Sequence, residues 1–249
     1  MFEIKKLNVS VDGKHVVKDI NLSINAGEIH VLMGPNGSGK TSFAQALMGQ
    51  PKLKVSGSIK LEGKELVKMP PDERARLGLF LSFQNPEEIE GVKTSNLMRK
   101  AMAAKDKAAP DMDAMLRMHE ALMGSAEKLG MEKAMVSREL NVGFSGGEKK
   151  RMEILQMMAL NPKLAVLDEP DSGLDVDGVK LIAEAIKELS DGKRGFLIIT
   201  HHADILKYLE AGFVHVLAQG RIVKSGGMEL AHEIEENGYG AYNGGAKDA

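Results

Sequence analysis

Residues 34–41 read GPNGSGKT, directly after the apolar run 29–33 and before a helix-compatible stretch over 41–48. In this G-x-x-x-x-G-K-[ST] pattern, the glycines permit a turn tight enough for backbone N–H groups to surround phosphate oxygens. Lys40 then carries a cation to the β and γ oxygens, and the Thr41 hydroxyl can hold Mg²⁺. This strand–loop–helix setting predicts a phosphate-binding loop. The predicted contacts are Gly34, Pro35, Asn36, Gly37, Ser38, Gly39, Lys40, Thr41 and Ser42.

A second motif, LAVLDEPDSGLD over 164–175, places two carboxylates at the end of an apolar strand. Asp168 is suited to bind Mg²⁺, directly or through water, and Glu169 to orient or deprotonate an attacking water. Surface carboxylates that merely end a strand are the alternative. The four apolar residues followed by D-E-P favour the catalytic interpretation.

The third motif, GFSGGEKKR over 143–151, precedes a helix predicted over 148–158. Ser145, Gly146 and Gly147 would put a hydroxyl and unobstructed N–H groups at a helix N-terminus, which is itself a site for an anion. One chain seldom needs two phosphate cradles for one nucleotide. We therefore expect the second cradle to serve a nucleotide held by another copy.

Composition excludes several other chemistries. The chain has no cysteine, which excludes disulfides, thiol nucleophiles and cysteine-based zinc sites. Its seven histidines show no metal-ligand spacing. A net charge of −2 gives no reason to expect nucleic-acid or acidic-lipid binding. No apolar run approaches the roughly 20 residues that span a bilayer, and the first residues, MFEIKKLNVSV, lack the apolar core of a signal peptide. These features predict a cytoplasmic chain without direct membrane insertion.

Strands alternating with helices predict an α/β fold with a mainly parallel sheet. The expected elements are alternating strands over 2–33, a hairpin over 57–66, a helix begun by Pro70-Pro71, strands over 79–83, 164–167 and 196–200, helices over 179–190, 203–208 and 229–236, and a hairpin over 214–224. Residues 92–138 are rich in Met, Ala, Lys and Asp, and predict an inserted helical subdomain with a polar hinge at 104–111. Its methionines 112, 115, 118 and 123 are expected in the core rather than in a ligand site. The tail from 238 on is Gly-rich and expected to fray.

Together these motifs resemble the ATP-binding-cassette (ABC) ATPases. Besides the phosphate loop and the 164–169 strand, the resemblance covers Gln84 as the Q-loop glutamine, SGGE (Ser145, Gly146, Gly147, Glu148) as the signature, Ser172 to Asp175 as the D-loop and His201 as the switch histidine. The resemblance implies a single domain, 1–249: a P-loop parallel-sheet core with an N-terminal antiparallel β subdomain, over 1–91 and 146–249, and a helical subdomain over about 92–145 that ends in the signature.

The family resemblance also implies a mechanism. Two chains would pack head to tail with two ATP molecules between them, each phosphate loop facing the partner's signature. Mg²⁺ would bind Thr41, Gln84 and Asp168, and the catalytic residues would be Lys40, Glu169 as base and His201 on the γ-phosphate. The aromatic residue that often stacks on adenine is missing. Val11 takes the matching position, with His15 nearby as a substitute or a solvated turn residue, so we expect weak selectivity for the base.

Within the family, four regions resemble the ATPase subunits of SUF iron–sulfur cluster assembly systems: FSGGEKKR, SFQNPEEIEGV, DEPDSGLDVDG, and HVLAQGRIVKSGG with the later ENGYG. The resemblance implies scaffold partners of the SufB and SufD type. A chain without thiolates cannot hold a cluster as such scaffolds do, which agrees with this role. The alternatives are the nucleotide-binding subunit of an ABC transporter, and a non-catalytic nucleotide-controlled module. The last would predict a broken 164–169 motif or switch position, yet Glu169 and His201 are present.

Overall fold

The computed structural model describes residues 1–106, 112–201 and 203–242. At its centre is a six-stranded sheet in the order β12-β11-β3-β10-β9-β6, parallel except for the β11–β12 pair. The strands are β3 (Ile29–Met33), β6 (Leu79–Ser82), β9 (Leu164–Asp168), β10 (Gly195–Thr200), β11 (Phe213–Ala218) and β12 (Arg221–Gly226). Strands β3, β9 and β10 are buried throughout because the sheet is covered on both faces. The predicted α/β fold is confirmed.

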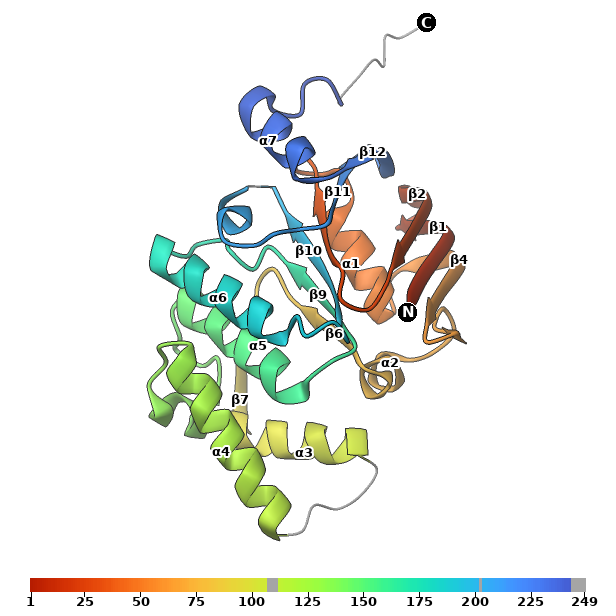
Figure 1. Ribbon diagram of the computed structural model, residues 1–249. Coiled ribbons are helices and arrows are strands. Elements are labelled where there is room, and N and C mark those ends of the chain that lie inside the picture. Colours follow the sequence, from red (N-terminus) through yellow and green to blue (C-terminus); the bar gives the residue numbers. More distant parts are fainter. Residues whose placement is uncertain (107–111, 202, 243–249) are drawn as a thin grey trace, which may run out of the picture.

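Helices cover one face of this sheet (Figure 1). They are α5 (Gly146–Leu160), α6 (Val176–Leu189) and α7 (Met228–Asn237). Side chains alternate along β3, so that Val31 packs toward these helices and Leu32 toward the opposite face. The helix α5 thus connects the segment 145–148 to the centre of the molecule.

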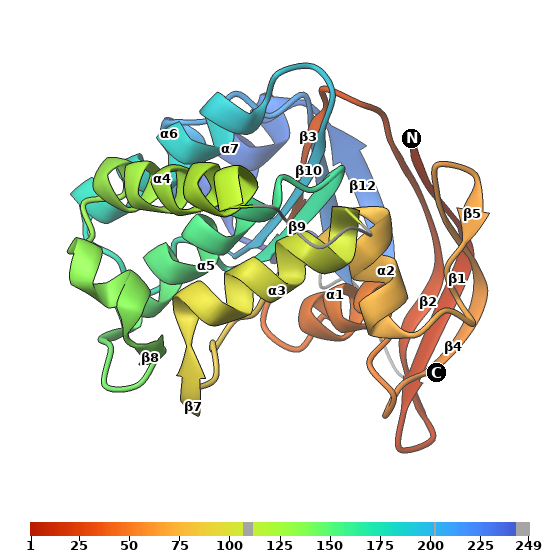
Figure 2. The ribbon, with the colours of Figure 1, turned by 90° about the horizontal axis from the view of Figure 1, so that it is seen from below.

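The opposite face packs against α1 (Lys40–Met48) and an antiparallel sheet. That sheet has the order β2-β1-β4-β5, with β1 (Phe2–Val11), β2 (Lys14–Ile24), β4 (Lys54–Leu61) and β5 (Lys64–Glu65), and α2 (Pro71–Leu77) follows it. Figure 2 shows this sheet on one side of the molecule and α4, α6 and α7 on the other, with the main sheet between. Phe43 and Leu47 of α1 are fully buried in this second core.

The described residues 94–106 and 112–137 contain the helices α3 (Thr94–Asp106) and α4 (Met112–Lys128) and the 3₁₀ helix η1 (Lys133–Ser137). Residues 104–106 of the predicted hinge belong to α3, and residues 107–111 lie outside the described parts. The core prediction is wrong for Met112, which is 79% exposed. The buried residues of α4 are Leu122 and Ala126, one turn apart near its C-terminal end, and Met112 lies at the opposite end of the helix. The other three methionines are half-buried.

A short β-ribbon and a 3₁₀ helix differ from the elements expected from the sequence. A short ribbon of β7 (Ile89–Lys93) and β8 (Glu139–Leu140) was not predicted, because neither strand has an alternating apolar pattern. The helix expected over 203–208 is the 3₁₀ helix η2 (Asp204–Lys207). Of the tail expected to fray, residues 238–242 form a turn, and residues 243–249 are outside the described parts. Among the described helices, none is both long and apolar enough to cross a bilayer.

Candidate active site

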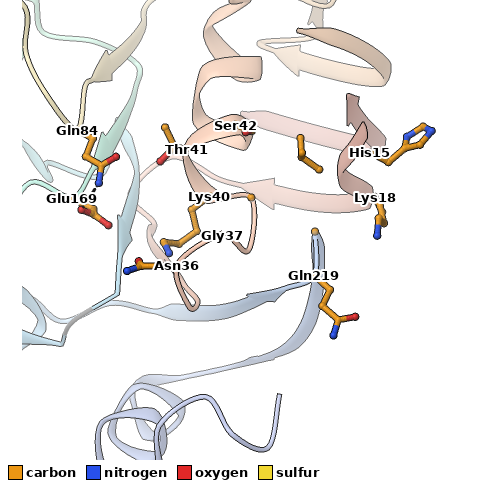
Figure 3. A pocket seen from close by; sticks show the side chains of 13 residues that line it. His15, Lys18, Asn36, Gly37, Lys40, Thr41, Ser42, Gln84, Glu169 and Gln219 are labelled. Atoms are coloured by element: carbon orange, nitrogen blue, oxygen red, sulfur yellow. Dashed lines mark hydrogen bonds between the residues drawn. The ribbon is translucent and has the colours of Figure 1, made fainter. Parts of the chain in front are cut away.

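A cavity of about 730 Å³ opens where β3 ends and α1 begins. In Figure 3, Gln84 and Glu169 lie on one side of Lys40, and His15 and Lys18 lie on the other. The cavity is lined by His15, Val16, Lys18, Asn36, Gly37, Gly39, Lys40, Thr41, Ser42, Gln84, Glu169, Gln219 and Gly220. The predicted loop residues Gly34, Pro35 and Ser38 do not line it, and Ser38 is buried.

The phosphate loop (residues 34–41) requires glycine for two physical reasons. A Cβ at Gly34 would lie 2.2 Å from the carbonyl oxygen of Leu217, and one at Gly39 would lie 2.5 Å from that of Val16. Gly39 also has a φ of 107°, which other residues rarely adopt. The loop therefore passes close to β2 and β11 and places the N-terminus of α1 at the cavity. The first N–H groups of a helix lack partners within it and attract anions.

The side chain of Lys40 folds back over the loop. Its ammonium group donates to the carbonyl oxygens of Gly34 at 2.7 Å and Pro35 at 3.0 Å. Burial lowers the pKa of Lys40, whereas the nearby charges of Glu169 and Asp168 raise it. Two carbonyl groups thus hold this cation at the cavity, where a phosphate group can replace them as its partner.

Asp168 ends β9 and is 2% exposed. Burial raises the pKa of Asp168 to about 6, and the hydrogen bond from the Thr41 hydroxyl acts in the opposite direction. Its Oδ1 atom is buried and has no hydrogen-bond partner among the described residues. Thr41, Gln84 and Asp168 all line an adjoining cavity of about 390 Å³. A buried carboxylate oxygen beside a hydroxyl group fits the oxygen ligands that Mg²⁺ prefers.

Glu169 contacts side chains from two other segments of the chain. Its Oε2 accepts a hydrogen bond from Gln84 Nε2 at 2.8 Å, and its Oε1 lies 2.9 Å from His201 Nδ1. The residue is 6% exposed and has a φ of 51°, so the chain turns sharply directly after β9. The fold therefore brings the predicted base, Q-loop glutamine and switch histidine into contact.

The signature helix α5 contributes two charged residues that sequence reasoning missed. Lys150 Nζ donates to the carbonyl oxygen of Phe83 at 2.9 Å, and Glu153 Oε1 accepts from the N–H of the same residue at 2.8 Å. Both side chains are buried, and they hold the backbone next to Gln84. The sequence could have indicated their burial through their spacing. Lys150, Glu153 and the buried Met157 follow one another at intervals of three and four residues, which places them on one face of α5.

Glu153→Gln should make the protein more stable at high pH. Burial raises the pKa of Glu153 to about 7, so the folded chain binds a proton that the unfolded chain releases above its ordinary pKa of 4.5. The wild type therefore loses stability as the pH rises from about 4.5 to 7. The glutamine still accepts from Phe83 but never ionises. We expect urea unfolding to show a gain of about 1–3 kcal/mol over wild type at pH 8 and little gain at pH 5.

The exposed Glu210→Gln serves as a control because it removes a surface carboxylate only. Its stability should stay within about 0.5 kcal/mol of wild type, because surface substitutions usually have small effects. If Glu153→Gln behaves like this control, ionisation of the buried Glu153 carboxyl group does not lower the free energy of unfolding, and the prediction is wrong.

The signature segment (residues 145–148) faces a separate cavity of about 470 Å³, which shares no lining residue with the phosphate cavity. Ser145 caps α5: its hydroxyl accepts from Glu148 N–H, and the Glu148 carboxylate accepts from Ser145 N–H in return. Asp175 also lines this cavity and caps α6, while Ser172 N–H donates to the carbonyl oxygen of Glu169. Within one chain the two predicted cradles are therefore separate.

The two residues named for the adenine region lie differently with respect to the phosphate cavity. Val11 does not line the phosphate cavity, whereas His15 and Val16 do. Val11 pairs with Lys14 next to the tight turn that begins β2, so the chain reverses before it reaches the cavity. His15 is exposed, and its Nδ1 lies 3.1 Å from Ser10 Oγ.

Comparisons with known proteins agree with this geometry. A family model described as ABC transporter matches residues 17–172. Vegetative protein 296 of Bacillus subtilis (strain 168) is 46% identical over 237 residues, which cover 95% of this chain and 90% of that protein. The probable ATP-dependent transporter SufC of Escherichia coli (strain K12) is 43% identical over 242 residues, covering 96% and 98%.

Solved structures share the fold. The ATP-binding subunit of an ABC transporter has a TM-score of 0.78 at 22% identity, covering 96% of this chain and 95% of that one. The dimeric structure of MJ0796, a bacterial ABC transporter cassette, has a TM-score of 0.76 at 21% identity, covering 92% and 99%. At these identities the likeness concerns the fold alone.

Proposed function

The chain belongs to the ABC transporter family of ATP-binding-cassette ATPases, and we propose that it is the ATP-hydrolysing subunit of a SUF-type iron–sulfur cluster assembly system. ATP hydrolysis follows from the family. The observation that carries the finer proposal is the 43% identity to SufC, which covers 96% of this chain and 98% of that protein. The site residues named below are part of the proposal.

The phosphate loop binds the triphosphate of ATP. Lys40 exchanges its present carbonyl partners, Gly34 and Pro35, for the β and γ oxygens. Asn36, Thr41 and Ser42 line the same cavity and complete the cradle. His15 and Val16 line the cavity next to this cradle, where the adenine would lie, and we expect modest selectivity for the base because neither offers a large aromatic surface.

Hydrolysis requires an activated water and stabilised phosphate charge. Thr41, Gln84 and Asp168 would hold Mg²⁺, which supplies positive charge to the β and γ oxygens. Glu169 accepts a proton from the water that attacks the γ phosphorus, while the bond from that phosphorus to the bridging oxygen breaks and releases ADP. His201 contacts the γ-phosphate. Gln84 and His201 each engage one oxygen of Glu169 and so orient the carboxylate, and each oxygen keeps a second lone pair with which it can accept from the attacking water.

A second copy would complete the site. The signature segment lies in its own cavity, and the N-terminus of α5 offers N–H groups to an anion. In a head-to-tail pair, Ser145 and Gly147 of one chain would contact the γ-phosphate held by the other. A single chain should therefore hydrolyse ATP slowly.

The work of this ATPase would be done on a scaffold. The chain has no cysteine, so a partner of the SufB or SufD type would bind the iron and sulfide. Residues 84–92 begin at the Q-loop glutamine and lead through β7 into α3 of the helical subdomain, and dimer closure would move a partner seated on them. We place this activity in the cytoplasm.

Affinity purification under mild conditions tests the proposal. The tagged chain should bring down a soluble, cysteine-containing protein at near-equal stoichiometry, identified by mass spectrometry. The second candidate is a transporter subunit, which the family model's description and the printed name of the Escherichia coli relative favour. An integral membrane permease as the stoichiometric partner would establish that role instead and reject the SUF proposal.

A further inference from the structure

The hydroxyl group of Tyr239 connects the phosphate loop with the segment that carries His201. It donates to the carbonyl oxygen of His201 at 3.3 Å and accepts a hydrogen bond from the N–H of Gly34. Tyr239 belongs to the ENGYG stretch just after α7, far along the chain from the phosphate loop. The proposed mechanism so far gives this residue no task.

Each of the two peptide groups that Tyr239 contacts is next to a catalytic group. The carbonyl group of Gly34 accepts from Lys40, whose ammonium group is directed at phosphate in the proposed mechanism. The imidazole group of His201 contacts Glu169, the proposed base. The hydroxyl oxygen of Tyr239 therefore links the phosphate loop, which holds the Lys40 cation, to the His201 segment, which contacts the Glu169 base.

The chain around Tyr239 is built to keep the hydroxyl group in place. Gly238 ends α7 with φ 65° and ψ −166°, a backbone conformation that is almost confined to glycine. Three residues on, the Tyr242 hydroxyl donates to Glu233 Oε1 at 2.6 Å and accepts from Lys224 at 3.2 Å. Both tyrosine rings pack against the core cluster that includes β3 and α7. Tyr239 is thus held from both sides of its position in the chain.

The hydroxyl group also keeps its proton. Burial raises the pKa of Tyr239 to about 12, although the Gly34 hydrogen bond acts in the opposite direction. At neutral pH it therefore remains a donor to His201 and an acceptor from Gly34 at the same time. A phenylalanine would fill the same space and make neither contact.

We propose that Tyr239 is a positioning residue for ATP hydrolysis, whose hydroxyl group fixes the phosphate loop relative to the His201 segment. This inference rests on the proposed roles of Lys40, Glu169 and His201. It predicts that loss of the hydroxyl misplaces the base and switch groups relative to the phosphate loop. ATP binding depends on the loop's own backbone and should be little affected, because the glycine contacts that shape the loop do not involve Tyr239.

The test compares Tyr239→Phe with Tyr242→Phe in the full chain. For Tyr239→Phe we expect kcat to fall about tenfold, while the Kd for ATP changes by less than about twofold and the melting temperature stays near that of wild type. Tyr242→Phe removes a hydroxyl group from the same segment, and among the described residues that group contacts Glu233 and Lys224 instead of His201 and Gly34. Because Tyr242 supports Tyr239 only through the chain between them, we expect kcat of this variant to fall by less than about twofold.

The outcomes separate this inference from the proposed function. If the wild-type chain does not hydrolyse ATP, the ATPase assignment itself fails. If the wild type is active and Tyr239→Phe has the same kcat, or loses kcat only as far as Tyr242→Phe does, the positioning role is rejected. A parallel loss of melting temperature and ATP affinity in Tyr239→Phe would also reject it, since the hydroxyl would then act on stability rather than on the catalytic step.

Discussion

Replacing Glu169 with glutamine should lower ATP turnover by about 10²-fold or more while ATP remains bound. The reason is chemical rather than steric. Glutamine has the shape of glutamate and can still accept from the Gln84 amide, but it cannot take the proton of the attacking water. Lys40 and the backbone of the phosphate loop are unchanged, so the affinity for ATP should be retained.

The variant should also accumulate the ATP-bound pair of chains. If hydrolysis releases the pair, a chain that binds ATP without cleaving it remains in the closed assembly. Phosphate release in a single turnover measures the chemical step, and size-exclusion chromatography with and without ATP measures the assembly. Turnover near the wild-type value would show that another group serves as the base.

Glu210→Gln is a suitable matched control, because it makes the same chemical change on the exposed surface. It should leave both phosphate release and the oligomeric state unchanged.

A Lys40→Ala variant should differ from Glu169→Gln in its affinity for ATP. It loses turnover together with part of the ATP affinity, since the cation contacts the phosphates in the ground state as well.

Much of the phosphate site could be predicted because its chemistry is local in sequence. The phosphate loop needs glycine wherever a Cβ would meet a neighbouring carbonyl group, as at Gly34 and Gly39, and this need appears directly as a motif. The carboxylates Asp168 and Glu169 follow from a buried strand that ends in polar residues. Parallel strands also bring their carboxyl ends to one edge of the sheet, which places these carboxylates near the loop.

The contacts between distant segments could not be predicted in the same way. No spacing rule shows that Gln84 donates to Glu169, 85 residues later, or that Tyr239 reaches back to Gly34. Lys150 and Glu153 are charged residues of the kind that usually face solvent, and in the folded chain their contacts with the backbone of Phe83 accompany their burial. A tertiary contact overrides the local pattern in each case.

The same limit explains the wrong prediction for Met112. Met112 belongs to an amphipathic helix, but the pattern does not say how far the helix extends past its neighbours. At the phosphate cavity, the hairpin between β1 and β2 determines which of its residues contribute to the lining: His15 and Val16 do, and Val11 does not.

Replacing Ser145 with arginine should abolish turnover without weakening the binding of ATP to a single chain. Ser145 is exposed, and its cavity shares no lining residue with the phosphate cavity, so the change cannot act directly on the ATP of its own chain. In a head-to-tail pair, the bulky side chain would occupy the space of the partner's γ-phosphate. We expect turnover per chain to fall by about 10²-fold or more.

The concentration dependence makes this test sharp. Wild-type turnover per chain should rise with protein concentration, because two chains make one complete site, whereas Ser145→Arg should stay low at every concentration. Its Kd for ATP, measured on the dilute chain with a fluorescent analogue, should match that of wild type. Preserved turnover in this variant would contradict the head-to-tail arrangement.

Loss of the helix cap is the competing explanation, since replacing a capping serine costs about 0.5–2 kcal/mol. Two variants separate it from steric blocking. Ser145→Asn keeps a capping side chain, so its stability should equal that of wild type. Gly146→Arg leaves the Ser145 cap intact and has open space around the new Cβ, yet it places the same bulky cation at the mouth of the cavity. If Gly146→Arg is as inactive as Ser145→Arg while its melting temperature is unchanged, a second chain must approach this surface for ATP to be hydrolysed.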